Sequence, residues 1–266
     1  MSRRKLSFNI MLAGSTGSGK SSFINTLFKK KMVEVNKKEF GRDIDVFVMD
    51  VDCEGIKKRM NVVDTPGFGS TMDDSILHDS IIAYIKSQYD VYLAEETKIR
   101  RNVRCEDTRI HVLLYFILPR RNGLRPTDIV FLKKVSNLVN VIPLISKADF
   151  LTPEESKNIK EKIKRQLIEN EINTFSFNTD LVPNSLELNE YKPFSIISNE
   201  WIRGDVEVGR KYYYGSVDVE NPAHCDFLVL KELLFTSYTD LLIDQTNNEL
   251  YEDYRAEVLA NILPSR

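Results

Sequence analysis

Apolar and polar positions repeat along the chain with two periods, one typical of β-strands and one typical of helices. Four short runs are almost entirely apolar and predict strands buried on both faces: residues 8–13, 110–117, 139–145 and 194–198. Three segments carry apolar residues at helical spacing: residues 22–28, 76–92 and 128–135. Because strands alternate with helices, the pattern predicts an α/β fold with a doubly wound, mostly parallel sheet.

Turn and capping signals add two elements to this outline. Residues 45–53 alternate with period two, a Glu-Gly turn follows, and residues 56–63 return as a strand, which predicts a hairpin. Thr152 has the chemistry of a helix N-cap and is followed by a proline and two acids. These residues suit a first helical turn, so we expect a long charged helix that ends near Glu171.

Two segments carry weaker signals. We expect residues 173–192 to form a variable loop, because they show neither period. Residues 226–254 predict an amphipathic helix or a pair of helices, with Asp226 as N-cap and leucines that pack mainly in the core.

Composition narrows the class of protein. The chain has 266 residues, 42% of them hydrophobic, which is enough for one large domain or a domain with an extension. The net charge of −2 gives no electrostatic reason to bind nucleic acid. Three scattered cysteines predict neither a disulfide framework nor a zinc site, and no run has the length of a signal peptide or a membrane span. We therefore expect a soluble, cytoplasmic protein.

The most informative motif is G-x-x-x-x-G-K-S at residues 14–21. It follows a predicted strand and opens a predicted helix, which is the arrangement of a phosphate-binding loop. Lys20 would reach the β- and γ-phosphates, and the Ser21 hydroxyl would bind Mg²⁺. A glycine- and serine-rich turn that matches by chance is the alternative, and the flanking elements argue against it. The residues expected at the phosphates are Gly14, Ser15, Thr16, Gly17, Ser18, Gly19, Lys20, Ser21 and Ser22.

A second motif, Asp-Thr-Pro-Gly at residues 64–67, ends a predicted strand. In phosphate-loop proteins an aspartate here holds Mg²⁺, usually through water, so we assign Asp64 to the metal together with Ser21. The Gly67 N–H would meet the γ-phosphate. Taken alone, the tetrapeptide could be a simple strand-to-turn transition, but the phosphate loop upstream favours the functional interpretation.

A third motif, Ser-Lys-Ala-Asp at residues 146–149, closes another predicted strand. The Asp149 carboxylate can accept hydrogen bonds from N1–H and the exocyclic amine of guanine, whereas adenine would leave it buried and unpaired. Lys147 would lie along the base. A solvated cap before a helix is the alternative for this tetrapeptide alone. Three motifs in this order predict GTP or GDP, with Mg²⁺, as the ligand.

The last quarter of the chain resembles the element that septins carry beyond their GTPase core. The resemblance lies in Gly-Arg-Lys-Tyr-Tyr-Tyr-Gly at 209–215 and in residues 219–227 and 251–255, together with 64–69 and 123–129. It implies a short basic segment at 1–6, a GTP-binding domain at 7–200, and a septin-specific element with a β-hairpin and C-terminal helices at 201–266.

The resemblance also implies a role. Septins are GTP-binding cytoskeletal subunits that polymerise into filaments with other septins, through a contact that buries the nucleotide and a contact between terminal helices. The arginine that matches Arg210 lies against the guanine base in that family, and Ser198 stands where the family has a glycine near the nucleotide. From the residues alone, cation–π packing of Arg210 on Tyr212 to Tyr214 is the default.

Departures from the family pattern bear on hydrolysis and pairing. Residues 27–63, which must contain the first switch loop, have no Ser, Thr or Tyr, so no hydroxyl can position the hydrolytic site. We expect hydrolysis to be slow or absent. Tyr214 replaces an expected tryptophan and Asn122 an expected histidine, which favours pairing with a different septin over self-pairing.

Other functions remain open at this point. A GTP-hydrolysing switch of the timer type could use the same core, and a phosphate-loop kinase is disfavoured by Asp149. Arg3, Arg4 and Lys5 could attract an anionic membrane surface at about 1 kcal/mol each, although a solvated N-terminus explains them equally well. The resemblance implies a location in the cortical cytoskeleton or in septin rings at division sites.

Overall fold

The computed structural model describes residues 7–33, 44–53, 56–69, 73–98, 106–177, 185–199, 201–202, 205–206, 210–213, 215–236 and 238–262. Within these residues a six-stranded sheet has the order β2-β3-β1-β4-β5-β6. Its strands are β1 (Ser7–Gly14), β2 (Asp45–Cys53), β3 (Ile56–Asp64), β4 (Val112–Ile117), β5 (Asn140–Ile145) and β6 (Phe194–Ser195). All neighbouring strands are parallel except β2 and β3, which form the predicted hairpin.

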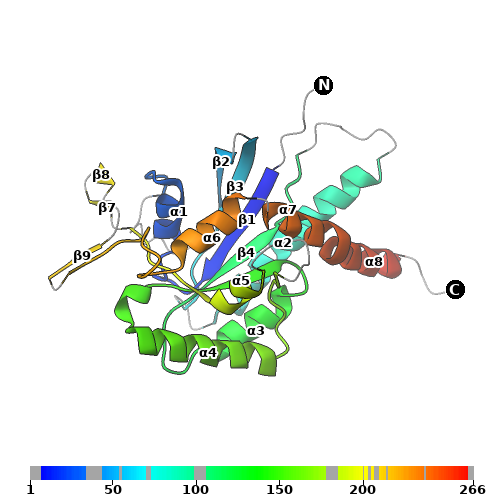
Figure 1. The fold of residues 1–266 in the computed structure, drawn as a ribbon. Coiled ribbons are helices and arrows are strands. Elements are labelled where there is room, and N and C mark those ends of the chain that lie inside the picture. The colour runs from blue at the N-terminus through cyan, green and yellow to red at the C-terminus, as the bar shows by residue number, and fades with distance from the viewer. Residues whose placement is uncertain are drawn as a thin grey trace.

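Helices cover both faces of the sheet (Figure 1). The helices are α1 (Lys20–Phe28), α2 (Ser75–Glu96), α3 (Pro126–Val135), α4 (Pro153–Glu169), α5 (Ser185–Tyr191), α6 (Phe227–Phe235), α7 (Tyr238–Gln245) and α8 (Tyr251–Ile262). Alternate β1 residues face opposite sides: Ile10 and Leu12 join a core with α1, α6 and α7, while Met11 and Ala13 join a core with α2, α3, α4 and α8. The predicted doubly wound α/β fold is therefore confirmed.

Two local predictions were wrong in part. The expected loop at 173–192 contains α5, and Phe175 and Phe177 are buried in the core; residues 178–184 lie outside the described part. The predicted strand at 194–198 is paired as a strand only at Phe194 and Ser195. Beyond it, the Ile196 N–H donates to Ile145 O at 2.8 Å and the Ile196 carbonyl accepts from Ala148 N at 3.1 Å, so the chain leaves the sheet towards the loop after β5.

The C-terminal segment forms α6, α7, a π-helical turn (Thr246–Leu250) and α8 instead of one or two helices. Leu230, Leu233, Leu234 and Leu242 are buried as predicted, and Leu241 is partly buried against the same core. Asp226 stands at the predicted N-cap position of α6, but its side chain makes no capping hydrogen bond. The Asp226 carboxylate instead accepts from Ser195 N at 2.7 Å and Lys160 Nζ at 2.6 Å. The N-cap position was predicted, but these side-chain partners were not, because they lie on β6 and α4 and local sequence does not show them.

Short strands complete the described chain beyond the sheet. They form two hairpins, β7 (Trp201–Ile202) with β8 (Asp205–Val206) and β9 (Arg210–Tyr212) with β10 (Gly215–Val217). The β9–β10 hairpin follows the β7–β8 hairpin along the chain, and Arg210 and Tyr212 lie two residues apart on the same face of β9.

Candidate nucleotide-binding site

The predicted phosphate loop lies between the end of β1 and the first turn of α1, as its motif requires. Gly17 and Gly19 have φ angles of 72° and 90°, in the left-handed region that favours glycine. At Gly14 a Cβ atom would lie 2.3 Å from the Phe116 carbonyl oxygen on β4, so no side chain fits. Backbone geometry and close packing therefore explain why these positions are glycines.

Lys20 is the cation of this loop. Its residue is only 7% exposed, and its Nζ donates to the carbonyl oxygens of Gly14 at 3.0 Å and Ser15 at 3.1 Å. Burial lowers the pKa of Lys20 to about 8, although Asp64 nearby opposes the shift. The Ser18 hydroxyl is also buried and has no hydrogen-bond partner among the described residues. A desolvated ammonium and an unsatisfied hydroxyl inside a glycine loop fit a phosphate group.

The predicted metal residues meet across two elements. The Ser21 hydroxyl, in the first turn of α1, donates to Asp64 Oδ2 at 3.0 Å, at the end of β3. Both oxygens are hard ligands of the kind that Mg²⁺ prefers, and they lie beside the lysine that would bind phosphate. The residues present therefore fit a magnesium ion shared with a nucleotide.

The segment after β3 is joined to the phosphate loop by backbone contacts that the sequence did not reveal. The Phe68 N–H donates to Gly14 O at 3.0 Å, and the Thr16 N–H donates to Phe68 O at 2.7 Å. The Thr16 hydroxyl donates to the Gly67 carbonyl at 2.8 Å. A Cβ atom at Gly67 would lie 2.5 Å from Thr16 Cα, so this glycine is needed for the close approach.

The predicted base-reading residue lies at the end of β5. Asp149 belongs to a 3₁₀ turn (Ala148–Phe150), its side chain is 0% exposed, and its Oδ1 has no hydrogen-bond partner among the described residues. Its Oδ2 accepts hydrogen bonds from Arg210 Nη1 at 3.0 Å and from the Tyr212 hydroxyl. A buried carboxylate with one oxygen left fits an N–H donor of guanine.

Arg210 joins two predicted nucleotide residues. Besides its bond to Asp149, its Nε donates to the Ser198 carbonyl at 2.9 Å. Among the described residues the guanidinium of Arg210 binds Asp149 and is not stacked on the ring of Tyr212 or Tyr213, because a buried carboxylate is a stronger partner than a ring face; the expected packing on Tyr214 lies outside the described part. Tyr212 was not predicted as a site residue; its period-two spacing from Arg210 was the signal that could have found it.

The structure brings most of the predicted residues to one edge of the sheet, at the carboxyl ends of β1, β3 and β5. Ser198 lies beside the loop, since a Cβ at Gly19 would be 3.9 Å from its Oγ. Ser22 lies in the first turn of α1, and Lys147 directly precedes the 3₁₀ turn with φ 53°. Their contacts with a nucleotide stay predictions. Residues 1–6, 34–43, 54–55 and Tyr214 lie outside the described part, so the switch-span, membrane and tryptophan-replacement predictions are not tested there.

Comparison with known proteins supports one family. The Septin family model matches residues 4–264. The chain is 44% identical over 262 residues to "Cell division control protein 11" of Encephalitozoon cuniculi, covering 97% of this chain and 96% of that protein. It is 38% identical to Septin-1 of Bos taurus, covering 98% of this chain and 76% of that protein.

Solved structures agree. The crystal structure of Cdc11 from Saccharomyces cerevisiae matches with a TM-score of 0.64 at 32% identity, over 95% of this chain and all of that one. The septin GTPase domain from Chlamydomonas reinhardtii matches with a TM-score of 0.76 over 95% of this chain and 99% of that one, but at 22% identity it supports the fold alone. With the family model over almost its full length, this chain belongs to the septin family.

Proposed function

We propose that this septin binds GTP or GDP with Mg²⁺ at the edge formed by β1, β3 and β5, and acts as a subunit of hetero-oligomeric septin filaments. One observation carries the proposal. A desolvated lysine in a glycine loop and a buried carboxylate at the end of β5 lie at the same edge of the sheet, and the carboxylate has an oxygen left for a donor. These two charges suit the two ends of a guanine nucleotide.

Within this site each residue has a distinct task. The phosphate loop and Lys20 bind the phosphates, Ser21 and Asp64 hold the metal, and Asp149 selects the base. Magnesium, when bound, neutralises phosphate charge and fixes the phosphate oxygens. The missing hydroxyls in residues 27–63 support a subunit that retains GTP, because unassisted GTPases already turn over at only about 10⁻⁴ per second.

Base selection is tested by replacing Asp149 with Asn. Guanine offers an amine at C2 and xanthine a carbonyl, so Asp149→Asn should lose affinity for GDP by about 100-fold and gain affinity for xanthosine diphosphate. Binding by calorimetry with both nucleotides, on the same two proteins, separates base reading from misfolding. An unchanged preference for guanine in the variant would contradict the assignment of Asp149.

Retention is tested on the purified protein. Denaturing it and analysing the released nucleotide should give GTP, and a single-turnover assay should show almost no phosphate release. Release at the rate of a cycling switch would favour the second candidate function, a timer GTPase. For assembly, we propose pairing with other septins in structures at division sites, as the names of the relatives suggest. A stable homodimer through the nucleotide face, measured by mass in solution, would count against the hetero-oligomer.

Attachment to an anionic membrane is a separate proposal, supported by the three basic residues near the N-terminus. Among the helices that the structure describes, none has both the length and the apolar character to cross a bilayer. The membrane contact proposed here is through the surface of the assembled protein, where many weak contacts add up.

A further inference from the structure

The start of helix α2 holds the segment of chain that follows β3. Asp74 stands at the N-cap position of α2, yet its side chain makes no capping hydrogen bond to that helix. The Asp74 Oδ1 instead accepts from the Gly69 N–H at 2.7 Å, and the residue is buried. A side chain in the position of a helix cap is therefore used to bind the backbone of another segment.

His78, one helical turn later, holds the same segment through its ring. The imidazole lies edge-on to the Phe68 ring, with 4.6 Å between the centroids, and its centroid is 5.0 Å from that of Phe131 on α3. His78 is 4% exposed and Phe68 is 1% exposed. Burial lowers the pKa of His78, although Asp74 opposes the shift, so the imidazole is neutral at pH 7 and packs as an aromatic ring.

The segment held in this way lies against the phosphate loop. The Phe68 backbone bonds to Gly14 O at 3.0 Å and to Thr16 N at 2.7 Å, and Gly67 approaches Thr16 so closely that no side chain fits. Gly67 is the residue whose N–H we expect at the γ-phosphate. A donor that is already in place binds a phosphate more tightly, because binding then requires no ordering of the chain.

We propose that Asp74 and His78 are positioning residues for the terminal phosphate of a nucleoside triphosphate. They hold Gly69 and Phe68, and through these two residues they fix the Gly67 N–H beside the phosphate loop. The inference rests on the proposed function, because it assumes that this loop binds a nucleotide. Since the loop and Lys20 bind the other phosphates, loss of the pair should weaken binding of a triphosphate and leave binding of a diphosphate unchanged.

The ring of His78 can be tested with a matched set of variants. His78→Ala removes the ring that packs on Phe68, whereas His78→Phe keeps a ring there. The His78 Nε2 has no hydrogen-bond partner among the described residues, so the phenylalanine leaves no partner of that atom unpaired. His111→Ala is the control, because it removes another buried imidazole, stacked on Phe8 at 5.7 Å, just before the amino end of β4.

Calorimetry with GDP and with GTPγS, both with Mg²⁺, on protein stripped of nucleotide measures the effect. In His78→Ala the affinity for GTPγS relative to GDP should fall about tenfold, which is the value of one hydrogen bond to a charged group. His78→Phe should restore the parent ratio, and His111→Ala should keep that ratio even where it lowers stability. Asp74→Ala removes the acceptor of the Gly69 N–H and no capping bond of α2, so it should match His78→Ala.

The outcomes separate two failures. A parent ratio of affinities in Asp74→Ala or in folded His78→Ala would overturn the proposal, as would an equal loss of GDP and GTPγS binding or a loss that His78→Phe does not reverse. If His78→Ala does not fold, Asp74→Ala decides alone. In each of these cases GDP still binds the parent protein, and the proposed function stands. If neither nucleotide binds the parent protein, the proposed function itself fails and the positioning pair fails with it.

Discussion

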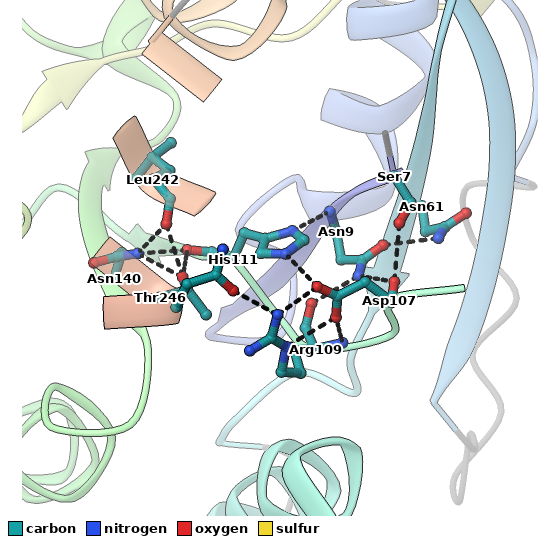
Figure 2. A network of polar contacts seen from close by, with 10 residues as sticks. Ser7, Asn9, Asn61, Asp107, Arg109, His111, Asn140, Leu242 and Thr246 are labelled. Atoms are coloured by element: carbon teal, nitrogen blue, oxygen red, sulfur yellow. Dashed lines mark hydrogen bonds and ion pairs between the residues drawn. The ribbon is translucent and has the colours of Figure 1, made fainter. Parts of the chain in front are cut away.

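The two ends of the central sheet use buried charge in opposite ways. At the carboxyl ends of the strands, Lys20 donates to loop carbonyls and Asp149 accepts from two side chains of one hairpin. The Lys20 ammonium suits a phosphate, and Asp149 Oδ1 has no partner among the described residues and suits a donor. At the amino ends, Arg109 and Asp107 belong to a network that draws on β1, β5 and the C-terminal helices (Figure 2).

The network at the amino ends is tied to the backbone at many points. Arg109 is 2% exposed, donates twice to the Asp107 carboxylate at 2.9 and 2.6 Å, and lies 3.5 Å over the Tyr92 ring. Asn9 Nδ2 donates to the carbonyls of Asp107 and Arg109. Asn140 Nδ2 donates to the carbonyl of His111, just before β4, and to that of Leu242 on α7. Such contacts fix the C-terminal helices on the sheet.

The comparison teaches how to tell structural from functional charge in this molecule. A charged side chain whose partners come from several distant elements cannot give them up without separating those elements. We therefore interpret the network at the amino ends as structural. A charge held by carbonyls of its own loop, or by a single hairpin, can bind a ligand without separating such elements. The predictions that follow are designed to break this distinction.

The largest effect is expected from Arg109→Leu. The variant leaves the Asp107 carboxylate without its cation in a mainly buried site and removes the packing on Tyr92. We expect the free energy of unfolding to fall by about 3 kcal/mol, because breaking a buried ion pair on one side is costly. Urea denaturation measures it.

Arg255→Ala is the control for that prediction, because it removes a partly exposed arginine that pairs with Glu252 one turn away on α8. Pairs of this kind contribute at most about 1 kcal/mol. A loss below about 1 kcal/mol in Arg109→Leu, equal to that of the control, would show that the network at the amino ends is not structural.

Lys20→Ala should show the reverse behaviour. We expect GDP affinity to fall by about 100-fold, since the phosphates lose a charged donor. The free energy of unfolding should not fall, because burial already penalises this ammonium, whose hydrogen bonds among the described residues go to loop carbonyls and whose interaction with Asp64 only partly offsets that cost. Calorimetry and urea denaturation of the same preparation give both values. Loss of stability as large as that in Arg109→Leu would abolish the contrast between the two ends.

Much of this contrast was beyond prediction from sequence. The apolar runs and helical spacing predicted the α/β class, the β2–β3 hairpin and the start of α4, because periodicity is set by near neighbours along the chain. The phosphate-loop residues were predicted together because they are contiguous in sequence. Their positions at the end of β1 follow from the strand and helix on each side.

The partners of the isolated charges were not predicted. Asp226 resembled a helix cap but binds Ser195 and Lys160, and Arg210 resembled a cation–π donor but binds Asp149. Each partner lies 31 to 66 positions away, so only the assembled fold brings it close. Asn9 and Asn140 stood as single polar residues in apolar runs, which gave no sign of the network that they join.

The smallest predicted effect is the change in the free energy of unfolding at acid pH, which should differ between variants at the two ends of the sheet. Burial alone would raise the pKa of Asp107, but the hydrogen bonds and charge of Arg109 hold it well below its usual value of 3.8. A carboxyl whose pKa is lowered by folding stabilises the protein above the unfolded value, and this contribution is lost as the pH falls below 3.8. Between pH 5 and pH 3 the parent should therefore lose about 1 kcal/mol more than Asp107→Asn. Lys20→Ala should follow the parent, because a lysine with a pKa of about 8 stays protonated throughout this range. Equal acid responses in the parent and Asp107→Asn would mean that the Asp107 carboxylate gains nothing from Arg109, and that the two ends of the sheet differ less than their contacts indicate.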